Sequence, residues 1–239
     1  MKPVALVTGA GTGLGAALAK SLANEGFALA LHYRTSKAGA LKTQASIIES
    51  GGIAETYQAN LARDNEAMGL AHAVASHFGR LDLLVNNAGV YQERKSIDLS
   101  EAEWFDGLNS TVSQTFFTTR AMLPLLRAGR LKRVVNIGDS SCDRPGARDL
   151  ALSYHIGKTG VWMLTRTLAA ELANDGIAVN MVSPGYLDNS LGLPGPDEIP
   201  AGRLGTFQDI YQAIRFLGLE SPDYLTGSNL VLSGGWNLR

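Results

Sequence analysis

The chain alternates short apolar runs with longer segments in which apolar positions recur every three to four residues. Short runs that are apolar throughout are typical of strands buried on both faces of a parallel sheet, and the longer periodic segments are typical of helices covering it. The pattern predicts strands over residues 4–8, 28–33, 54–59, 81–86, 133–137, 178–183 and 229–233. It predicts helices over residues 13–24, 37–50, 65–78, 101–127, 153–174 and 207–217, with the 101–127 helix bent near Pro124.

This alternation predicts an α/β fold: a doubly wound parallel sheet of the Rossmann type, with about seven strands and helices on both faces. We expect one domain over residues 1–239, because no linker rich in Pro, Gly and Ser interrupts the alternation before residue 184. Residues 184–206 contain four prolines and several glycines. We expect this segment to form a lid over a substrate, since connections of this length are usually functional; an ordinary surface loop is the alternative.

Composition narrows the function classes. A net charge of -1, from 21 basic and 22 acidic residues, provides no field for nucleic acid or an anionic membrane. Cys142 is the only cysteine, which excludes an intrachain disulfide and suits a reducing cytoplasm. No apolar run approaches the roughly 18 residues that span a bilayer, and the first residues enter a strand with no room for a signal peptide. The four scattered histidines give no metal-ligand spacing, so we expect no metal.

The first strand leads into a glycine-rich turn before the first helix. Glycines let backbone amides approach a pyrophosphate, and a helix N-terminus adds favourable partial charge. Leu14 stands where the G-x-G-x-x-G spacing would require its last glycine, so the turn departs from that motif. We expect a bound nucleotide; a tight turn without a ligand is the alternative. The residues concerned are Gly9, Gly11, Thr12, Gly13, Leu14 and Gly15.

The end of the second strand indicates which nucleotide is bound. NAD enzymes often carry an acid here that binds the ribose 2′-hydroxyl, but the chain reads Tyr33, Arg34, Thr35 and Ser36. Arg34 can pair with a 2′-phosphate, with the two hydroxyls as further donors. We therefore expect NADP(H); a solvated basic turn is the alternative. After the fourth strand, the small residues of Asn87-Ala88-Gly89 allow the backbone to pass close to a ribose.

Tyr154 and Lys158 lie four residues apart in the predicted 153–174 helix, and so on one face of it. A lysine ammonium beside a phenol favours the phenolate, which predicts a tyrosine pKa below its usual value of about 10. Such a tyrosine can exchange a proton with an alcohol or a carbonyl oxygen. His155 is rotated by about 100° around the helix, and we expect it to be structural.

Together these residues resemble the short-chain dehydrogenase/reductase family over nearly the whole chain. The family's T-G-x-x-x-G-x-G, N-N-A-G and Y-x-x-x-K motifs are matched at residues 8–15, 86–89 and 154–158. Three dipeptides also match, Pro184-Gly185, Thr226-Gly227 and Gly234-Gly235. These motifs are weak singly, but their order and spacing are specific.

The resemblance implies roles for individual residues. Tyr154 would be the catalytic acid/base, and Lys158 would bind the nicotinamide ribose and lower the tyrosine pKa. Asn109 looks like the asparagine that holds a proton-relay water; a polar residue bonded to a helical carbonyl is the alternative. The resemblance also implies cofactor contacts at Asn60, Leu61, Asn87, Ala88, Gly89, Pro184, Gly185, Leu187 and Asn189, with Asn60 and Asn189 replacing the usual aspartate and threonine.

The family's catalytic serine has two candidates in this chain. Counting from the fifth strand reaches Asp139, and counting back from Tyr154 reaches Ser141. We favour Asp139, because an insertion in the following loop costs less than shifting a buried strand. Pteridine reductases of this family carry an aspartate at this place, and the end of their second strand looks similar.

We therefore expect an NADP(H)-dependent oxidoreductase that transfers a hydride between nicotinamide and a carbonyl or alcohol substrate. By resemblance, the first candidate substrate is a 3-oxoacyl thioester or similar ketone, and the runner-up activity is a pteridine reductase. A non-catalytic dinucleotide sensor is the rival from another class, but such proteins typically lose the Tyr/Lys pair. Family analogy also predicts a homotetramer, with Trp162 and Met163 at a subunit face or, alternatively, in the core.

Overall fold

The computed structural model describes residues 2–144, 146–190 and 193–238. Within them, seven strands form one sheet in the order β3-β2-β1-β4-β5-β6-β7, and every neighbouring pair is parallel. This is the doubly wound arrangement that the strand–helix alternation predicts. The strands are β1 (Val4–Val7), β2 (Ala28–Tyr33), β3 (Ile53–Gln58), β4 (Leu83–Asn86), β5 (Arg133–Ile137), β6 (Ala178–Pro184) and β7 (Asn229–Leu232).

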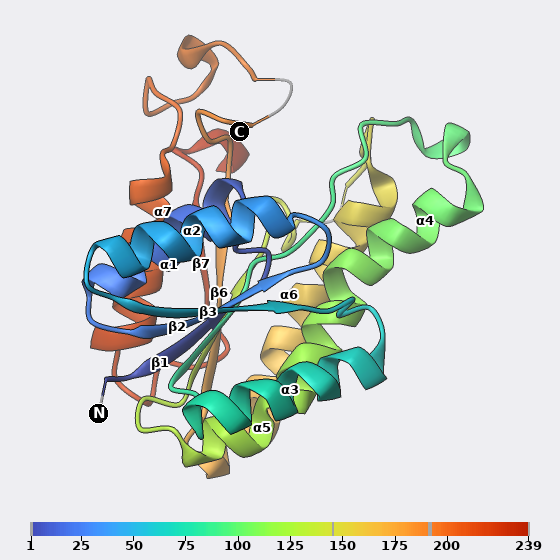
Figure 1. The fold of residues 1–239 in the computed structure, drawn as a ribbon. Coiled ribbons are helices and arrows are strands. Elements are labelled where there is room, and N and C mark those ends of the chain that lie inside the picture. The colour runs from blue at the N-terminus through green and yellow to red at the C-terminus, as the bar shows by residue number, and fades with distance from the viewer. Residues whose placement is uncertain (1, 145, 191–192, 239) are drawn as a thin grey trace.

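Helices cover both faces of the sheet, α1, α2 and α7 on one side and α3, α5 and α6 on the other (Figure 1). The helices are α1 (Gly13–Asn24), α2 (Lys37–Glu49), α3 (Asp64–Phe78), α4 (Glu101–Leu108), α5 (Gln114–Ala128), α6 (Leu152–Leu172) and α7 (Phe207–Arg215). Short helical turns add η1 (Ser96–Asp98), η2 (Asn109–Ser113), η3 (Ala173–Asp175), η4 (Pro196–Glu198), η5 (Phe216–Glu220) and η6 (Trp236–Leu238).

Strand β1 shows how the apolar runs build two cores. Val4 and Leu6 belong to the cluster beneath α3, α5 and α6, whereas Ala5 and Val7 belong to the cluster beneath α1 and α7. Successive strand residues point to opposite faces, so a strand between two helical layers has to be apolar at every position. Burying each large aliphatic side chain contributes roughly 1.5–3 kcal/mol. The sheet is thereby a rigid base for the loops at its edge.

The predicted helix over residues 101–127 is divided. A π-helical turn, η2, separates α4 from α5, and α5 continues through Pro124 to Ala128. The winding therefore changes at Asn109–Ser113, and the expected bend near Pro124 is not where the helix is interrupted. The Thr111 hydroxyl donates to the carbonyls of Gly107 (2.7 Å) and Leu108 (3.1 Å), which competes with regular α-helical bonding. Such π turns are frequent at functional sites.

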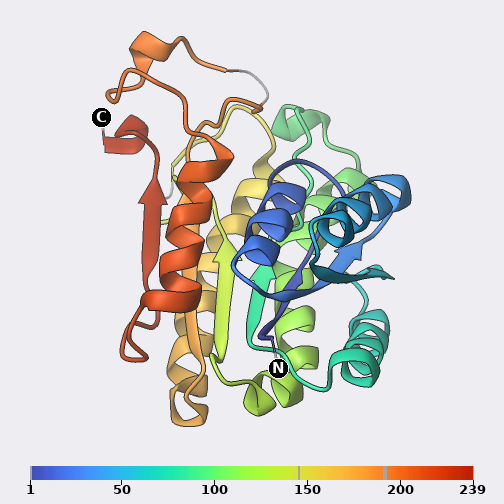
Figure 2. The same ribbon diagram turned by 60° about the vertical axis from the view of Figure 1, so that its left-hand side comes forward.

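Segment 184–206 stands beyond the carboxyl ends of the strands, coloured orange in Figure 2, with the C-terminus beside it. Leu187 forms a parallel bridge with Gly205, and the Ala201 amide donates to the Gly234 carbonyl at 2.9 Å. The segment is thus joined to its own base and to the residues that follow β7. Residues 191 and 192 of it lie outside the described residues. Across the described chain, no helix combines the length and apolar character needed to cross a membrane.

Candidate active site

A cavity of about 370 Å³ lies at the carboxyl ends of β1, β2 and β4. Most residues that the sequence proposed for the cofactor line it: Gly9, Gly11, Thr12, Gly13, Leu14, Gly15, Tyr33, Arg34, Thr35, Ser36, Leu61, Asn87, Ala88 and Gly89. They come from four loops that are distant in sequence, those after β1, β2, β3 and β4. The parallel order of the strands brings these loops to one edge.

The glycine-rich turn leaves space where a ligand would lie. Gly9 and Gly13 have positive φ angles of 68° and 52°, which side chains rarely adopt. A Cβ on Gly15 would lie 2.2 Å from the Gly9 carbonyl oxygen, so the turn closes only with glycine there. A Cβ on Gly13 would instead meet open space, with Asn189 Nδ2 as its nearest neighbour at 4.0 Å. This open side, at the N-terminus of α1, fits a dinucleotide pyrophosphate.

A buried histidine that the sequence analysis did not assign to the site holds this turn in place. Nδ1 of His32 accepts from the Gly9 amide at 3.3 Å, and Nε2 donates to the Ala59 carbonyl at 3.0 Å. Burial lowers the pKa of His32 to about 4, although the bond to Ala59 opposes this. The imidazole is therefore neutral near pH 7, with its proton on Nε2. Its position at the end of a buried strand, before the predicted phosphate-binding residues, was the available signal.

Arg34 lies at the rim of the first cavity and already has an acidic partner. Its Nη1 lies 3.0 Å from Asp106 Oδ1 of α4, and 40% of the arginine side chain is exposed. An ion pair this exposed contributes little to stability. The guanidinium keeps further donors for an anion at the rim.

Asn60 is not brought into either cavity described here, although its neighbour Leu61 lines the first. Its amide oxygen accepts from the Ala62 backbone at 3.2 Å, and its own backbone amide donates to Glu66 Oε2 at 2.6 Å. The side chain thus stabilises the turn that enters α3. A cofactor contact by Asn60 stays a prediction.

A second cavity, of about 1240 Å³, adjoins the first, and Leu14, Asn87 and Gly89 line both. Apart from Asn60 and Asn109, the remaining predicted residues line the second cavity: Asp139, Ser141, Tyr154, Lys158, Pro184, Gly185, Leu187 and Asn189. Aromatic side chains also line it, among them Tyr91, Tyr186 and Trp236. The rings of Tyr186 and Trp236 meet edge to face with centroids 5.2 Å apart, linking segment 184–206 to the C-terminal turn.

Tyr154 and Lys158 share one face of α6, as their spacing predicts. Lys158 Nζ lies 5.4 Å from the centre of the Tyr154 ring and donates to the Ile137 carbonyl at 2.6 Å. Burial lowers the pKa of Lys158 to about 8. A Cβ on Gly89 would lie 3.8 Å from both Lys158 Nζ and Tyr154 Cε2. The pair therefore stands where the two cavities meet.

The expected lowering of the tyrosine pKa is wrong for this structure. Burial raises the pKa of Tyr154 far above its usual value, and the charges of Asp139, Tyr91 and Cys142 raise it further. Burial destabilises the Tyr154 phenolate more than the Lys158 ammonium stabilises it, because the ammonium donates its hydrogen bond to the Ile137 carbonyl. Tyr154 is thus held in its protonated form and is a proton donor.

Asp139 and Ser141, the two candidates for the serine position, lie together. Asp139 follows the end of β5 by two residues, and its Oδ1 accepts from the Ser141 backbone amide at 2.9 Å and from the Ser141 hydroxyl. Both residues line the second cavity. The structure therefore does not show which of the two takes the family's serine position, because Asp139 and Ser141 are hydrogen-bonded to each other.

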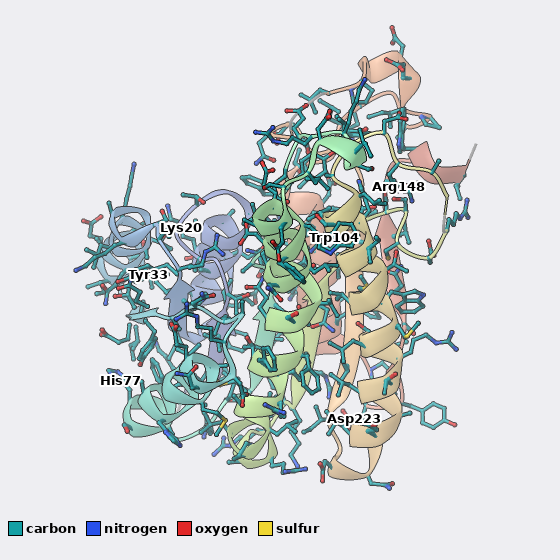
Figure 3. All side chains as sticks on the ribbon, turned by 90° about the vertical axis from the view of Figure 1, so that its right-hand side faces the viewer. Lys20, Tyr33, His77, Trp104, Arg148 and Asp223 are labelled. Carbon is teal, nitrogen blue, oxygen red and sulfur yellow. The ribbon has the colours of Figure 1, made fainter. Side chains whose placement is uncertain are left out.

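His155, which was expected to be structural, lines the second cavity beside Tyr154. Its Nδ1 lies 3.9 Å from Asp139 Oδ1, and its ring meets those of Tyr154 and Tyr91 at centroid distances of 5.4 and 6.0 Å. The loop between β5 and α6 passes this end of the helix, so two neighbouring helical positions both face the cavity. Arg148, in that loop, lies at the same end of the molecule as segment 184–206 (Figure 3).

Asn109 begins the π turn η2, and its Oδ1 accepts from the Ser113 hydroxyl at 3.0 Å. It lines neither cavity among the described residues. Thr111 and Val112 of η2 face α6, and Thr111 Oγ1 would lie 1.8 Å from a Cβ on Gly157. The proton-relay role of Asn109 stays a prediction.

The asparagines after β4 tie the strand ends together, as predicted. Asn86 Nδ2 donates to Asn136 Oδ1 on β5 at 2.8 Å and to Thr119 Oγ1 on α5 at 3.0 Å. Asn87 Nδ2 donates to the Thr8 carbonyl at 2.9 Å. These bonds between strand ends fix the edge on which the site is built. In the described part of the chain, no cluster of three or more His, Cys, Asp or Glu side chains is arranged to hold a metal.

Comparisons with known proteins agree with this geometry. The family model described as enoyl-(acyl carrier protein) reductase matches residues 9–237. The 3-oxoacyl-(acyl-carrier-protein) reductase FabG of Haemophilus influenzae is 32% identical, with 97% of each chain covered. The FabG of Staphylococcus aureus strain N315 is 33% identical, with 98% of each covered.

Solved structures are similar over the same length. A mutant of a Serratia marcescens short-chain dehydrogenase/reductase superposes with a TM-score of 0.88 at 29% identity, covering 98% of this chain and 97% of that one. A blue fluorescent protein from a metagenomic library, in complex with NADPH, superposes with a TM-score of 0.89 at 28% identity, covering 98% of each chain.

Proposed function

The chain belongs to the short-chain dehydrogenase/reductase family, and on that premise we propose that it uses NADPH to reduce the carbonyl group of a small molecule to an alcohol. The observation that carries the proposal is the place of Tyr154 and Lys158. They stand at the junction of the two cavities, beside Gly89, which lines both. A cofactor in the first cavity and a substrate in the second would meet there.

The first cavity fits a dinucleotide, with the open side of Gly13 for the pyrophosphate and Arg34, Thr35 and Ser36 for the 2′-phosphate. The strand end has no acid for an unmodified ribose, which supports NADP(H) over NAD. The structural relative in complex with NADPH gives further support. When bound, the dihydronicotinamide supplies the hydride for the carbonyl carbon.

The chain's own residues supply the proton and the orientation. Tyr154 is held protonated, so it donates its phenolic proton to the carbonyl oxygen as that oxygen gains charge. Lys158 holds its ammonium beside the phenol from a fixed position on the Ile137 carbonyl, and it favours the phenolate that remains. The raised pKa keeps Tyr154 protonated at neutral pH, the state that donates to a carbonyl oxygen, and leaves little of the phenolate that alcohol oxidation needs, which supports reduction over alcohol oxidation.

The first candidate substrate is a 3-oxoacyl thioester or a similar ketone. The names of the curated relatives support it, and so does a second cavity lined by Tyr91, Tyr186 and Trp236. A pteridine reductase is the second candidate, supported by the count from the end of β5, which reaches Asp139 at the family's serine position. We propose segment 184–206 as the lid, because Leu187 and Asn189 face the cavity and Ala201 is bonded to the C-terminal turn.

A homotetramer is proposed by family analogy. Met163 on α6 is 70% exposed, and Ile156 on the same helix and Phe116 on α5 are exposed as well. An apolar face of this kind is typical of a contact between subunits. Sedimentation equilibrium at several concentrations would measure the assembly directly.

The proposal is tested by following NADPH oxidation with ethyl acetoacetate, acetoacetyl thioester, crotonyl thioester and a dihydropterin. We expect turnover of the ketones and tighter binding of NADPH than of NADH. Turnover of the dihydropterin alone would favour the second candidate. NADPH binding without turnover of any compound would favour the non-catalytic sensor and contradict the proposal.

A further inference from the structure

The Ser141 hydroxyl is committed to an internal partner. It donates its hydrogen to Asp139 Oδ1, which also accepts from the Ser141 backbone amide. A hydroxyl has one hydrogen and two lone pairs. Toward the second cavity, which both residues line, Ser141 therefore offers only lone pairs, and the Asp139 carboxylate is likewise an acceptor.

The charge of Asp139 also selects the tautomer of His155. The imidazole turns Nδ1 toward the carboxylate, at 3.9 Å, and this negative charge favours the neutral tautomer that has its proton on Nδ1. Nε2 then bears a lone pair and has no hydrogen-bond partner among the described residues. The ionisable groups that face the ring are Asp139 and Arg148 from the loop before α6, and the phenols of Tyr91 and Tyr154. Burial lowers the pKa of His155, which keeps the ring neutral at pH 7.

Asp139, Ser141 and His155 thus form an acceptor wall beside the proton donor Tyr154. Nearby cations are already engaged: Lys158 donates to the Ile137 carbonyl, and Arg148 Nη2 donates to the Ser141 and Arg144 carbonyls at 3.2 and 3.3 Å. A ketone oxygen is itself an acceptor and finds its donor in Tyr154. The side chains of His155 and Asp139 are 18% and 22% exposed, so water reaches them in the open cavity. A substrate that displaces this water has to supply a donor of its own, because polar groups buried without a partner cost free energy.

We propose that the site takes carbonyl compounds with a hydroxyl on the carbon next to the reacting carbonyl, and that His155 is the specificity-determining residue that accepts from this hydroxyl. The ring centroid of His155 lies 5.4 Å from that of Tyr154. A substrate group one bond away from the reacting carbon is therefore within its reach. The inference rests on the proposed carbonyl reduction and adds a preference among ketones.

The test compares 2-hydroxyacetophenone with propiophenone, which has a methyl in place of the hydroxyl. Each ketone is titrated calorimetrically into enzyme saturated with NADP⁺, which has no hydride to transfer, so binding is measured without turnover. Reduction of both ketones by NADPH is then followed separately. Failure of the proposed function would appear as absent reduction, and failure of this inference as absent discrimination in binding.

His155→Phe is the informative variant, because it retains a ring against Tyr91 and Tyr154 but has no acceptor. His72→Phe, an exposed position on α3, is the matched control. We expect wild type and the control to bind the hydroxy ketone at least about 10-fold more tightly than propiophenone, because a site built to bond a hydroxyl rejects the analogue lacking it. His155→Phe should remove most of that ratio while leaving the affinity for propiophenone within about three-fold.

Titration with pH distinguishes hydrogen bonding from a merely structural role. Protonation of His155 turns Nε2 into a donor. The ratio of the two ketone affinities in wild type should therefore be constant near neutral pH. It should fall at acid pH, below the ordinary histidine pKa of about 6.5. The ratio for His155→Phe should not change. Equal binding of both ketones by wild type, or equal weakening of both in His155→Phe, would overturn the proposal.

Discussion

Lys158 Nζ lies 5.4 Å from the centre of the Tyr154 ring, while its hydrogen bond goes to the Ile137 carbonyl at 2.6 Å. Lys158 therefore lies beside the phenol but does not offset the increase in the Tyr154 pKa that burial causes. Asp139, on the other side of the site, adds a negative charge that opposes ionisation of Tyr154. Burial of the phenol, reinforced by the Asp139 charge, sets the protonation state on which the chemistry depends.

Asp139→Asn should make Tyr154 more acidic, because it removes a negative charge that raises the tyrosine pKa. Alcohol oxidation with NADP⁺ needs the phenolate, so its rate rises with pH through that pKa. We expect the alkaline limb of the pH–rate profile to move to lower pH in this variant. Asp98→Asn, an exposed position in η1, is the control and should leave the limb in place. A limb that moves to higher pH would contradict this assignment.

His32 should make stability depend on acid pH. Its pKa is about 4 in the folded chain, against about 6.5 when unfolded. The unfolded state therefore binds more protons as the pH falls below 6.5, so stability is complete above that value and declines toward pH 4. The loss approaches about 3 kcal/mol at pH 4.

The check on His32 is urea unfolding of wild type and His32→Gln between pH 4 and 7. Glutamine keeps one donor and one acceptor but does not titrate. The stability of wild type relative to the variant should fall as the pH is lowered through this range. A difference that is independent of pH would show that His32 is not held neutral.

Arg34→Ala should weaken NADPH binding while leaving NADH binding nearly unchanged. The variant removes the guanidinium proposed for the 2′-phosphate, and a charge-assisted hydrogen bond of this kind contributes about 1.5–3 kcal/mol, or at least about 10-fold in Kd. Lys42→Ala removes one exposed positive charge from the neighbouring α2 and is the control.

Asp106→Asn should have the opposite effect to Arg34→Ala. The Asp106 carboxylate pairs with Arg34 at 3.0 Å and competes with a phosphate for it. Its removal is expected to tighten NADPH binding, as measured by fluorescence titration. Equal weakening of NADPH and NADH in Arg34→Ala would mean that Arg34 supports the loop and not the 2′-phosphate.

Gly157→Ala should destabilise the helix pair that positions Tyr154 and Lys158. The new Cβ would lie 1.8 Å from Thr111 Oγ1 and 2.8 Å from Thr111 Cβ, so α6 and η2 have to separate. Overpacking of this kind typically costs about 1–3 kcal/mol. Gly69→Ala in α3, where the added Cβ meets nothing within 4 Å, is the matched control and should be neutral or slightly stabilising. Equal midpoints for both variants in urea unfolding would contradict the close contact.

The fold could be predicted because its sequence signals, the apolar strands and the glycines at helix ends, recur along the chain and do not depend on distant contacts. Strands buried on both faces, such as β1 (Val4–Val7), are apolar at every position, and the helices α1 and α3 end near Gly26 and Gly79, both with positive φ. The long helix before β5 was predicted without its interruption. The π turn there depends on Thr111 bonding and on the contact with Gly157, which are tertiary features.

The sequence grouped the candidate residues that lie at strand ends, but it did not reveal properties that depend on how the rest of the chain packs around a residue. The parallel sheet brings the glycine turn, Arg34 and Gly89 to one cavity. The direction of the Tyr154 pKa was predicted wrongly, because spacing reveals the ammonium and not the burial. His155 was assigned to the structural residues from helical geometry alone, since the loop that passes it is not visible in a pattern.

The central claim is that Tyr154 donates the proton during carbonyl reduction, and Tyr154→Phe tests it most directly. The measurement pairs stopped-flow NADPH oxidation under single-turnover conditions with a fluorescence titration of NADPH binding. We predict that the variant binds NADPH as wild type does and reduces ketones at least about 100-fold more slowly, because a positioned acid is removed and little else changes. Reduction within a few-fold of the wild-type rate, with cofactor binding intact, would contradict the account.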